Sequence, residues 1–352
     1  MKKLLVTLMS LMMTASAVFA FGAAKPVQTL DVLPLLASES AQQNRLWVGT
    51  FQLAWNELME GVVKGPVVFV GPKSELAKQL NKQKFKTNDL SEDSYYTTYG
   101  ETSPELKAKI EKAIMEKFNE TSDVLDAVDW TPGPNKYLVY AMLKKDFKFL
   151  TAFDKLDMDK FARNKTKVQY FGINEKSDPI LRHTVNVLFY NSSKDYAVAI
   201  RTEGKDVLYL YRTNDDKTFD KLYSDMFMKK VQFNGNTEFS KIDELKVPDI
   251  NLYKEKSFAE LCDKEIKDTK GMMIDQALET VDFKMNNEGV KLKSEAVIAT
   301  KMSMPIMTEK LRPRKFYFND TFVMFLQEND KNKPYFALRV KDVSLINKTG
   351  RK

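Results

Sequence analysis

Cysteine and histidine are nearly absent from this 352-residue chain, which contains one of each. Cys262 has no partner for an internal disulfide, so the fold depends on its hydrophobic core. We expect Cys262 to be a buried structural residue in a helix that Ser257 and Glu260 open as a capping box. His183, in a strand-like stretch, is expected to be structural, because no nucleophile motif or metal-ligand spacing accompanies it. These absences argue against an enzyme, a cofactor and a metal site.

Long hydrophobic runs are also missing, so no segment after the N-terminal one is apolar enough to span a membrane as a helix. The chain begins MKKLLVTLMSLMMTASAVFAFGAAKP. Lys2 and Lys3 precede a short apolar segment, and AVFA supplies small residues for cleavage after about Ala20. We interpret residues 1–20 as a secretory signal peptide, with a short N-terminal anchor as the alternative. The mature chain is then expected to be secreted, or periplasmic, as a soluble monomer without a membrane span.

Charges of both signs are interleaved almost everywhere, although the formal net charge is +7. Lysine alternates with glutamate in segments such as ELKAKIEKAIMEKFNE. This pattern is typical of a solvated helix face and argues against a nucleic-acid-binding stripe. No linker rich in glycine, proline or serine divides the chain, so residues 21–352 are expected to form one domain.

Helical patterns come first along the chain. Apolar spacing predicts a helix over residues 44–63, with Trp47 and Phe51 on one face. A short strand at 67–70 and a helix after Pro72 follow, and then a polar loop at 84–101. Ser103 as N-cap and Pro104 in the first turn predict a further helix, whose apolar face contains Leu106, Ile110, Ile114 and Phe118.

Strand patterns dominate the remainder. Alternating or apolar runs predict strands at 136–143, 167–173, 181–190, 195–200, 206–213, 229–235, 278–298, 315–328 and 334–346, with a short helix near 216–226. The last two strands are expected to form a hairpin across NDKNK. Helices followed by mostly antiparallel strands indicate an α+β protein.

Four segments, in order, resemble the serpin family of protease inhibitors. VVFVGPKSELAKQL is similar to the family's corner after its first helix, and YLVYAMLKKDFKFL is similar to its L-V-N-A-I-Y-F-K-G-x-W segment. VDFKMNNEG is similar to its strand and hinge, and FYFNDTFVMFLQENDKNKPYFALRV to its C-terminal strand pair. The resemblance implies a single domain with N-terminal helices, a large mostly antiparallel main sheet, smaller sheets and an exposed reactive loop.

Several residues depart from the family's pattern. Tyr140 replaces an asparagine, Leu338 a glycine and Thr321 a proline, while Glu279 replaces a histidine that helps to latch the main sheet in many serpins. The stretch before Tyr137 is also short. Some helices are therefore expected to be missing, including the one that lies across the main sheet. These departures place the latch and the control of loop insertion in doubt.

The resemblance implies that the stretch after Phe283 contains the hinge of a reactive loop. The hinge residues are Glu288, Gly289, Val290, Leu292, Ser294 and Ala296. From Gly289 onward, one alternating set contains no charge, and the other set holds Lys291, Lys293 and Glu295. Insertion between two strands is thus permitted in one register only. An ordinary two-faced strand, already part of the sheet, fits the same alternation. Bulky Leu292 argues against fast insertion.

The scissile bond has two candidate positions in the bait segment 299–312. Counting forward from Gly289 gives Ser303–Met304, and counting back from Phe318 gives Lys310–Leu311. The bait residues are Met302, Ser303, Met304, Lys310, Leu311 and Arg312. The methionines suit a chymotrypsin- or subtilisin-like pocket, and Lys310 suits a trypsin-like one.

The function that this resemblance implies is inhibition of a serine or cysteine endopeptidase by cleavage and insertion of the reactive loop. The expected partner is therefore a trypsin-like or a chymotrypsin- or subtilisin-like protease, with no nucleic acid. The alternative is a non-inhibitory serpin-fold protein that binds a ligand or partner and is only a protease substrate.

Overall fold

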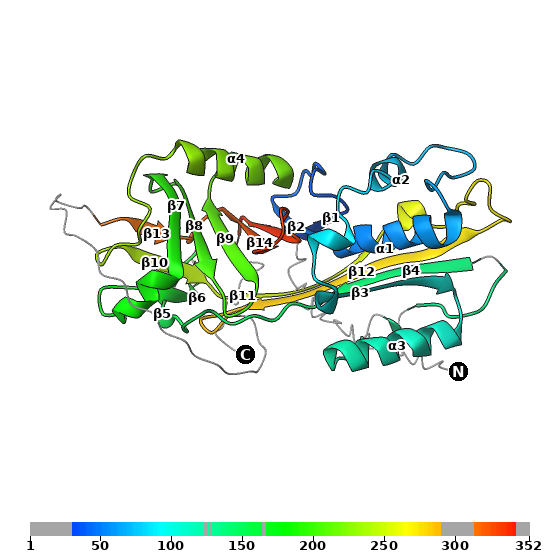
Figure 1. The fold of residues 1–352 in the computed structure, drawn as a ribbon, viewed down its shortest axis with the longest axis horizontal. Helices are drawn as coiled ribbons and strands as arrows, with labels where there is room; N and C mark the ends of the chain where they lie inside the picture. The colour runs from blue at the N-terminus through cyan, green and yellow to red at the C-terminus, as the bar shows by residue number, and fades with distance from the viewer. Residues whose placement is uncertain are drawn as a thin grey trace, which may run out of the picture.

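The computed structural model describes residues 30–122, 125–126, 128–134, 136–163, 167–289 and 313–342, which form three β-sheets with helices around them (Figure 1). The largest sheet has seven strands in the order β1-β2-β15-β14-β9-β8-β7. Their bounds are β1 Leu30–Leu33, β2 Asn44–Val48, β15 Phe336–Val340, β14 Phe322–Glu328, β9 Asp206–Arg212, β8 Asp195–Arg201 and β7 Val185–Ser192. Only β1 and β2 pair in parallel within it.

A second sheet has the order β11-β12-β4-β3, and we call it the main sheet. Its strands are β11 Ile250–Ser257, β12 Met273–Met285, β4 Lys136–Leu143 and β3 Tyr95–Glu101. The third sheet has the order β13-β10-β6-β5, with β13 Lys315–Tyr317, β10 Glu244–Pro248, β6 Lys167–Ile173 and β5 Asp154–Lys160. Most strand pairs are antiparallel, as the sequence predicts.

The helices lie around the seven-stranded sheet and the main sheet. They are α1 Thr50–Leu58, α2 Glu75–Leu80, α3 Pro104–Phe118 and α4 Phe219–Gln232, with a π-helical turn, η1, at Met59–Val63. Single 3₁₀ segments lie at η2 Thr87–Asp89, η3 Glu92–Ser94, η5 Pro179–Thr184 and η6 Ala259–Leu261. No helix in the described residues is long and apolar enough to cross a membrane.

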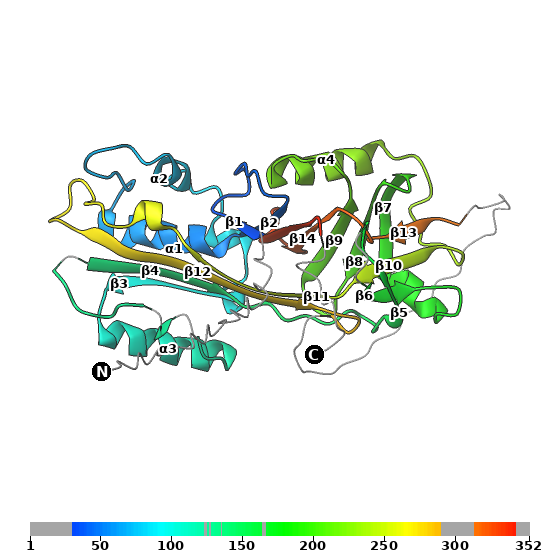
Figure 2. The same ribbon diagram turned by 180° about the vertical axis from the view of Figure 1, so that it is seen from behind.

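Two helices lie on opposite faces of the main sheet (Figure 2). On one face, Val139 and Ala141 of β4 pack with α1 in a core that also contains Trp55. On the other face, Leu138 and Tyr140 pack against α3. Because side chains alternate along a strand, β4 is apolar at every position from 138 to 141. The expectation that no helix lies across the main sheet is therefore wrong, since α3 occupies that place.

Local signals located several elements correctly. Ser103 caps α3 by accepting a hydrogen bond from the Leu106 amide, and Ser74 caps α2 in the same way through Ala77. The hairpin between β14 and β15 is also confirmed.

Residues 44–48 form a strand, although their apolar spacing predicts the start of a helix. Asn44–Val48 pairs with both β1 and β15, so Trp47 is buried in the seven-stranded sheet. Gly49 is the N-cap of α1, and a Cβ there would lie 2.4 Å from the Phe85 ring. Pairing with the C-terminal strand outweighs the local helical pattern, because strand preference depends on tertiary context.

Three further predictions of elements are wrong. The polar segment 84–101 contains β3, which pairs with all eight residues of β4 except the first. Residues 67–70 form only an isolated bridge at Phe69, and the strand predicted at 229–235 is largely the end of α4. In each case the conformation of the segment depends on whether a strand that is distant in the sequence pairs with it.

Cys262 is buried, as expected, but the capping box at Ser257 is wrong. Ser257 is the last residue of β11, and only the short turn η6 follows it. Burial raises the pKa of the Cys262 thiol to about 11. His183 lies in the 3₁₀ segment η5 and is exposed, so its assignment to a strand is also wrong.

Candidate functional site: the seam between β4 and β12

The centre of the main sheet is its one parallel pair, β4 and β12, and we call their line of contact the seam. The pairing runs from Met273 beside Lys136 to Val281 beside Leu143. β3 is antiparallel to β4, and β11 is antiparallel to β12. A strand added at the seam in the opposite direction would be antiparallel to both neighbours, which is the more stable pairing per residue. The strand directions therefore suit the seam to accept one more strand.

A tight turn at residues 286–289, the hinge turn, follows β12 directly. Asn286 and Gly289 exchange two backbone hydrogen bonds of 3.2 Å each. On the other side, Gly289 bridges Lys148, and the Phe149 amide donates to the Glu288 carbonyl at 3.2 Å. Because Lys148 and Phe149 follow β4 in the chain, the hinge turn lies between the ends of the two seam strands.

The hinge turn requires glycine at its last position. Gly289 has a φ of +111°, and a Cβ there would lie 2.4 Å from the Phe147 carbonyl oxygen and 2.7 Å from the Lys148 Cα. Both contacts involve backbone, which cannot rotate away. The geometry thus explains why glycine stands at position 289, and the hinge role of Gly289 stays a prediction.

Gly289→Ala is expected to lower the free energy of unfolding by about 2 kcal/mol or more, because strain and a backbone clash act together. Equilibrium urea unfolding measures the loss. Gly204→Ala is the matched control, because a Cβ at Gly204 meets no atom within 4 Å. Equal losses in the two variants would contradict the described hinge geometry.

Glu279 is a fully buried carboxyl group in the middle of β12, one strand away from Ala141 of β4. The Thr50 hydroxyl donates to its Oε1 at 3.0 Å, and the Phe51 amide donates at 3.3 Å. Its Oε2 has no hydrogen-bond partner among the described residues. Burial raises the pKa of Glu279 to about 8 against the opposing effect of these donors. Glu279 thus supplies the side-chain cap that Gly49 cannot give to α1.

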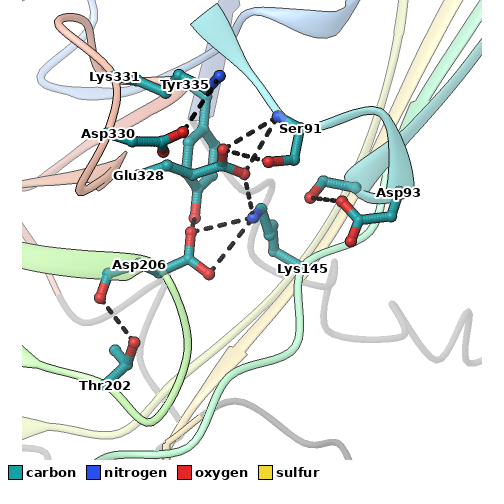
Figure 3. A network of polar contacts seen from close by, with 10 residues as sticks. Ser91, Asp93, Lys145, Thr202, Asp206, Glu328, Asp330, Lys331 and Tyr335 are labelled. Carbon is teal, nitrogen blue, oxygen red and sulfur yellow. Dashed lines mark hydrogen bonds and ion pairs between the residues drawn. The ribbon is translucent and has the colours of Figure 1, made fainter.

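A buried network of charges lies where the chain leaves β4 (Figure 3). The Lys145 ammonium contacts Glu328 at 2.6 Å and Asp206 at 3.1 Å. Tyr335 donates to Asp206 at 2.7 Å, and the Ser91 hydroxyl donates to Glu328 at 2.6 Å. Burial alone would raise the pKa of Glu328, but Lys145 and Ser91 hold it below its usual range. The network joins the β3–β4 half of the main sheet to the seven-stranded sheet.

Lys145→Met is expected to lower the free energy of unfolding by about 3–5 kcal/mol, because two buried carboxylates lose their cation. Lys112→Met is the control, since the exposed pair Lys112–Glu116, at 3.8 Å, contributes about 0.5 kcal/mol or less. Denaturant unfolding of both variants gives the comparison. A loss below about 1 kcal/mol at Lys145 would show that the network contributes little.

The predicted site residues fall into two groups. Glu288 and Gly289 lie in the hinge turn, as described above. Val290, Leu292, Ser294, Ala296 and all six bait residues lie outside the described residues, as does the segment 1–20, so these assignments remain predictions. The sequence did not reveal Thr50 as the partner of Glu279, or Lys145 as the centre of a network. The lysine of the family's F-K-G motif was the one available signal for Lys145.

No protein-family model matches the chain, and no curated protein matches it significantly. Solved structures do resemble it. Thyroxine-binding globulin in complex with thyroxine aligns with a TM-score of 0.51 at 11% identity, over 85% of this chain and 92% of the globulin. Serpin48 of the insect Tenebrio molitor aligns at 0.46 and 14% identity, with the same two coverages of 85% and 92%. A mouse protein Z-dependent protease inhibitor aligns at 0.44 and 16% identity, over 76% of this chain and 69% of its own. The alignment with the globulin shows a shared fold.

Proposed function

Because this chain has the serpin fold, we propose that it inhibits serine or cysteine endopeptidases through cleavage and insertion of its reactive loop. The bait is the segment 299–312, and the inserting strand begins at Gly289. The protease cuts the bait, stays attached, and is displaced when the cut loop enters the seam. The chain acts as an inhibitor and substrate, and not as an enzyme.

The position and register of the hinge turn carry this proposal. Gly289 pairs with Asn286, so a strand that continues the turn along β12 would place Val290 beside Met285 and Leu292 beside Phe283. The same register places Ser294 beside Val281 and Ala296 beside Glu279. All four of these β12 partners are buried.

The opposite set of side chains would face outward in this register. Lys291 would lie beside Lys284, and Lys293 beside Asp282. Lys284 and Asp282 are exposed and pair with each other at 3.3 Å. Directly opposite side chains of an antiparallel pair share one face of the sheet. The charge-free set of the loop therefore matches the buried face of β12, and the charged set matches its exposed face.

The test is to mix the mature protein with trypsin, chymotrypsin and subtilisin and to separate the products on a denaturing gel. A band at the summed mass of protein and protease is expected with at least one of them. Protease whose catalytic serine has been blocked is the control and should give no such band. Clean cleavage without a covalent band in all three cases would overturn the proposal.

Paired variants distinguish between the two candidate scissile bonds. Lys310→Ala should abolish trypsin-like cleavage if the bond is Lys310–Leu311. Met304→Ala should leave that cleavage intact. Loss of chymotrypsin or subtilisin cleavage in Met304→Ala, but not in Lys310→Ala, would support Ser303–Met304.

Export is part of the same proposal, because a secreted protease inhibitor must leave the cytoplasm. Mass spectrometry of the protein from its native cells is expected to show an N-terminus near Phe21 and a free thiol at Cys262. A mature chain that retains residues 1–20 would contradict this part.

A second candidate function is binding of a small ligand, and one cavity favours it. A pocket of about 700 Å³ lies between the segment 34–39, α1 and α2, and its lining includes Trp47 and Phe85. This volume is within the range of small-molecule sites. The buried Gln52 side chain also lines it, and its Oε1 has no hydrogen-bond partner among the described residues. The apolar lining and the Gln52 Oε1 suit an apolar molecule with one hydrogen-bond donor, and charged residues such as Glu75 and Lys84 also line the pocket.

Leu36→Ala distinguishes the two candidates, because Leu36 lines this pocket and is only half-buried. It should weaken binding of an apolar fluorescent probe such as ANS to this pocket, and it should not change formation of the covalent protease band. Loss of probe binding together with clean cleavage of the native chain would favour the ligand-binding function.

A further inference from the structure

The outer edge of β3 is the most open strand edge in the described part of the chain. β3 is the last strand of the main sheet, and no described strand pairs with its far side. Its sequence, YYTTYGE, has no proline and no charge before Glu101, and its register with β4 is unbroken over seven pairs. Proteins usually protect a long edge strand with charges, proline, bulges or a covering segment. β3 has none of the first three.

The other sheet edges carry such protection. β11 has three consecutive charged residues at 254–256, and β5 has both a charge-rich sequence and a register shift after Leu156. β7 is covered, because Val187 donates to the Thr237 carbonyl at 3.1 Å. β1 and β13 are only 4 and 3 residues long. β3 is thus the exception, which points to a use for its free backbone groups.

A groove runs along the first part of this edge. A cavity of about 460 Å³ is lined by residues 95–97 of β3, with Glu57 of α1 on one side and Glu116 of α3 on the other. Glu92 and Lys117 complete the charged lining. Three carboxylates and one lysine give the groove a local negative charge, although the whole chain is positive at +7.

Side chains on β3 alternate between the two walls of the groove. Thr97 points to the α1 side, where its hydroxyl donates to the Glu57 carboxylate. Tyr96 packs with the α3 cluster on the other side. Burial raises the pKa of Glu57, and no cation is among the causes of that shift. A cation brought into the groove would favour the charged form of this carboxyl group.

We propose that the outer edge of β3 binds an extended, lysine- or arginine-bearing segment of a partner protein as a fifth strand of the main sheet. The free backbone groups of β3 supply the pairing, and basic side chains at successive positions of the partner strand face opposite walls of the groove, one toward Glu57 and the next toward Glu116. A second copy of this chain is a poorer occupant, because pairing of β3 with β3 would bring the same acidic walls together. The proposal is independent of loop insertion, since β4 separates this edge from the seam.

The test uses a synthetic eight-residue peptide in which pairs of lysines alternate with pairs of valines, so that lysines face both walls; it is acetylated and amidated and is mixed with the full mature chain at low salt. Hydrogen–deuterium exchange is expected to show peptide-dependent protection of residues 95–101 and none along β12. The same peptide with alternate backbone amides N-methylated keeps its charge but cannot pair, and it should give no protection. A glutamate–valine peptide should not bind.

Charge reversal identifies the walls of the groove. Glu116→Lys together with Glu92→Lys should weaken peptide binding by roughly tenfold, about 1.4 kcal/mol. Glu111→Lys is the matched control, because Glu111 forms the same kind of exposed helical pair, with Lys107 at 3.6 Å, but does not line the groove. Protection confined to β12, equal binding by all variants, or binding of the N-methylated peptide would each overturn the proposal. So would concentration-dependent protection of β3 without peptide, which would identify a second copy as the occupant.

Discussion

Cleavage within residues 300–314 should raise the unfolding midpoint of the protein by about 5 °C or more, whereas a nick in an ordinary loop lowers it. In the proposed mechanism, the uncut loop is attached at both ends, so its first part cannot enter the seam. Cleavage would free residues 289–298 to pair with β12 and β4. Each apolar side chain buried there stabilises by about 1.5–3 kcal/mol, and each new ladder hydrogen bond by about 1 kcal/mol.

The paired variants Val290→Arg and Val297→Arg test the register of insertion. In the proposed register Val290 faces the buried side of the sheet, beside Met285, and Val297 lies on the opposite side, beside the half-buried Leu278. Val290→Arg should abolish the rise in midpoint, because an unpaired charge would enter the core. Val297→Arg makes the same chemical change and should preserve the rise. Neither variant alters the bait, so cleavage itself should proceed in both.

Differential scanning calorimetry of intact and cleaved protein measures this effect. A cleaved native chain that melts at or below the intact protein would refute insertion and leave a serpin fold without the serpin mechanism. Equal effects of the two arginine variants would refute the register. In that case the alternating pattern after Gly289 would have another cause.

Elements with local signals could be predicted from the sequence, and elements defined by distant partners could not. Ser103 and Pro104 mark the start of α3 within one turn, so its bounds follow from neighbouring residues. The strand at 44–48 is decided by β15, nearly three hundred residues away, and its own spacing indicates a helix. Periodicity describes one segment at a time and contains no information on such pairing.

The same distinction applies to the candidate site. Gly289 was identified because a single glycine interrupts an alternating strand, and the structure gives it a positive φ. Glu279 was noted only as a departure from the family's histidine. Its donor Thr50 is 229 residues away, and Lys145 is 183 residues from Glu328. Buried polar contacts over such separations leave no pattern in a single sequence.

The native chain should lose stability as the pH rises from about 4.5 to about 8, and Glu279→Gln should abolish this pH dependence. The unfolded chain releases this proton near pH 4.5, while burial retains it in the folded chain up to about pH 8. The folded state therefore binds more protons than the unfolded state throughout this interval, and stability falls as pH rises. Below the interval both states are protonated, and above it both are ionised, so the dependence is confined to this window.

The size of the effect follows from the shift in pKa. At about 1.4 kcal/mol per pH unit, the free energy of unfolding of the native chain should fall by about 5 kcal/mol relative to the glutamine variant across the window. Comparison of the two chains at each pH cancels the contributions of all other titrating groups. Glutamine has nearly the shape of protonated glutamate, so its carbonyl oxygen can still accept from Thr50 and Phe51.

Urea unfolding at several pH values between 4 and 9 gives both curves. Glu255→Gln is the control, because Glu255 lies one strand away on β11 and is exposed. Its curve should run parallel to that of the native chain. A constant difference between the native chain and Glu279→Gln would show that the pKa of Glu279 is the same in the folded and the unfolded chain. The hydrogen bonds from the start of α1 would then fully offset the effect of burial, and Glu279 would be an anionic cap for α1 at the seam at neutral pH.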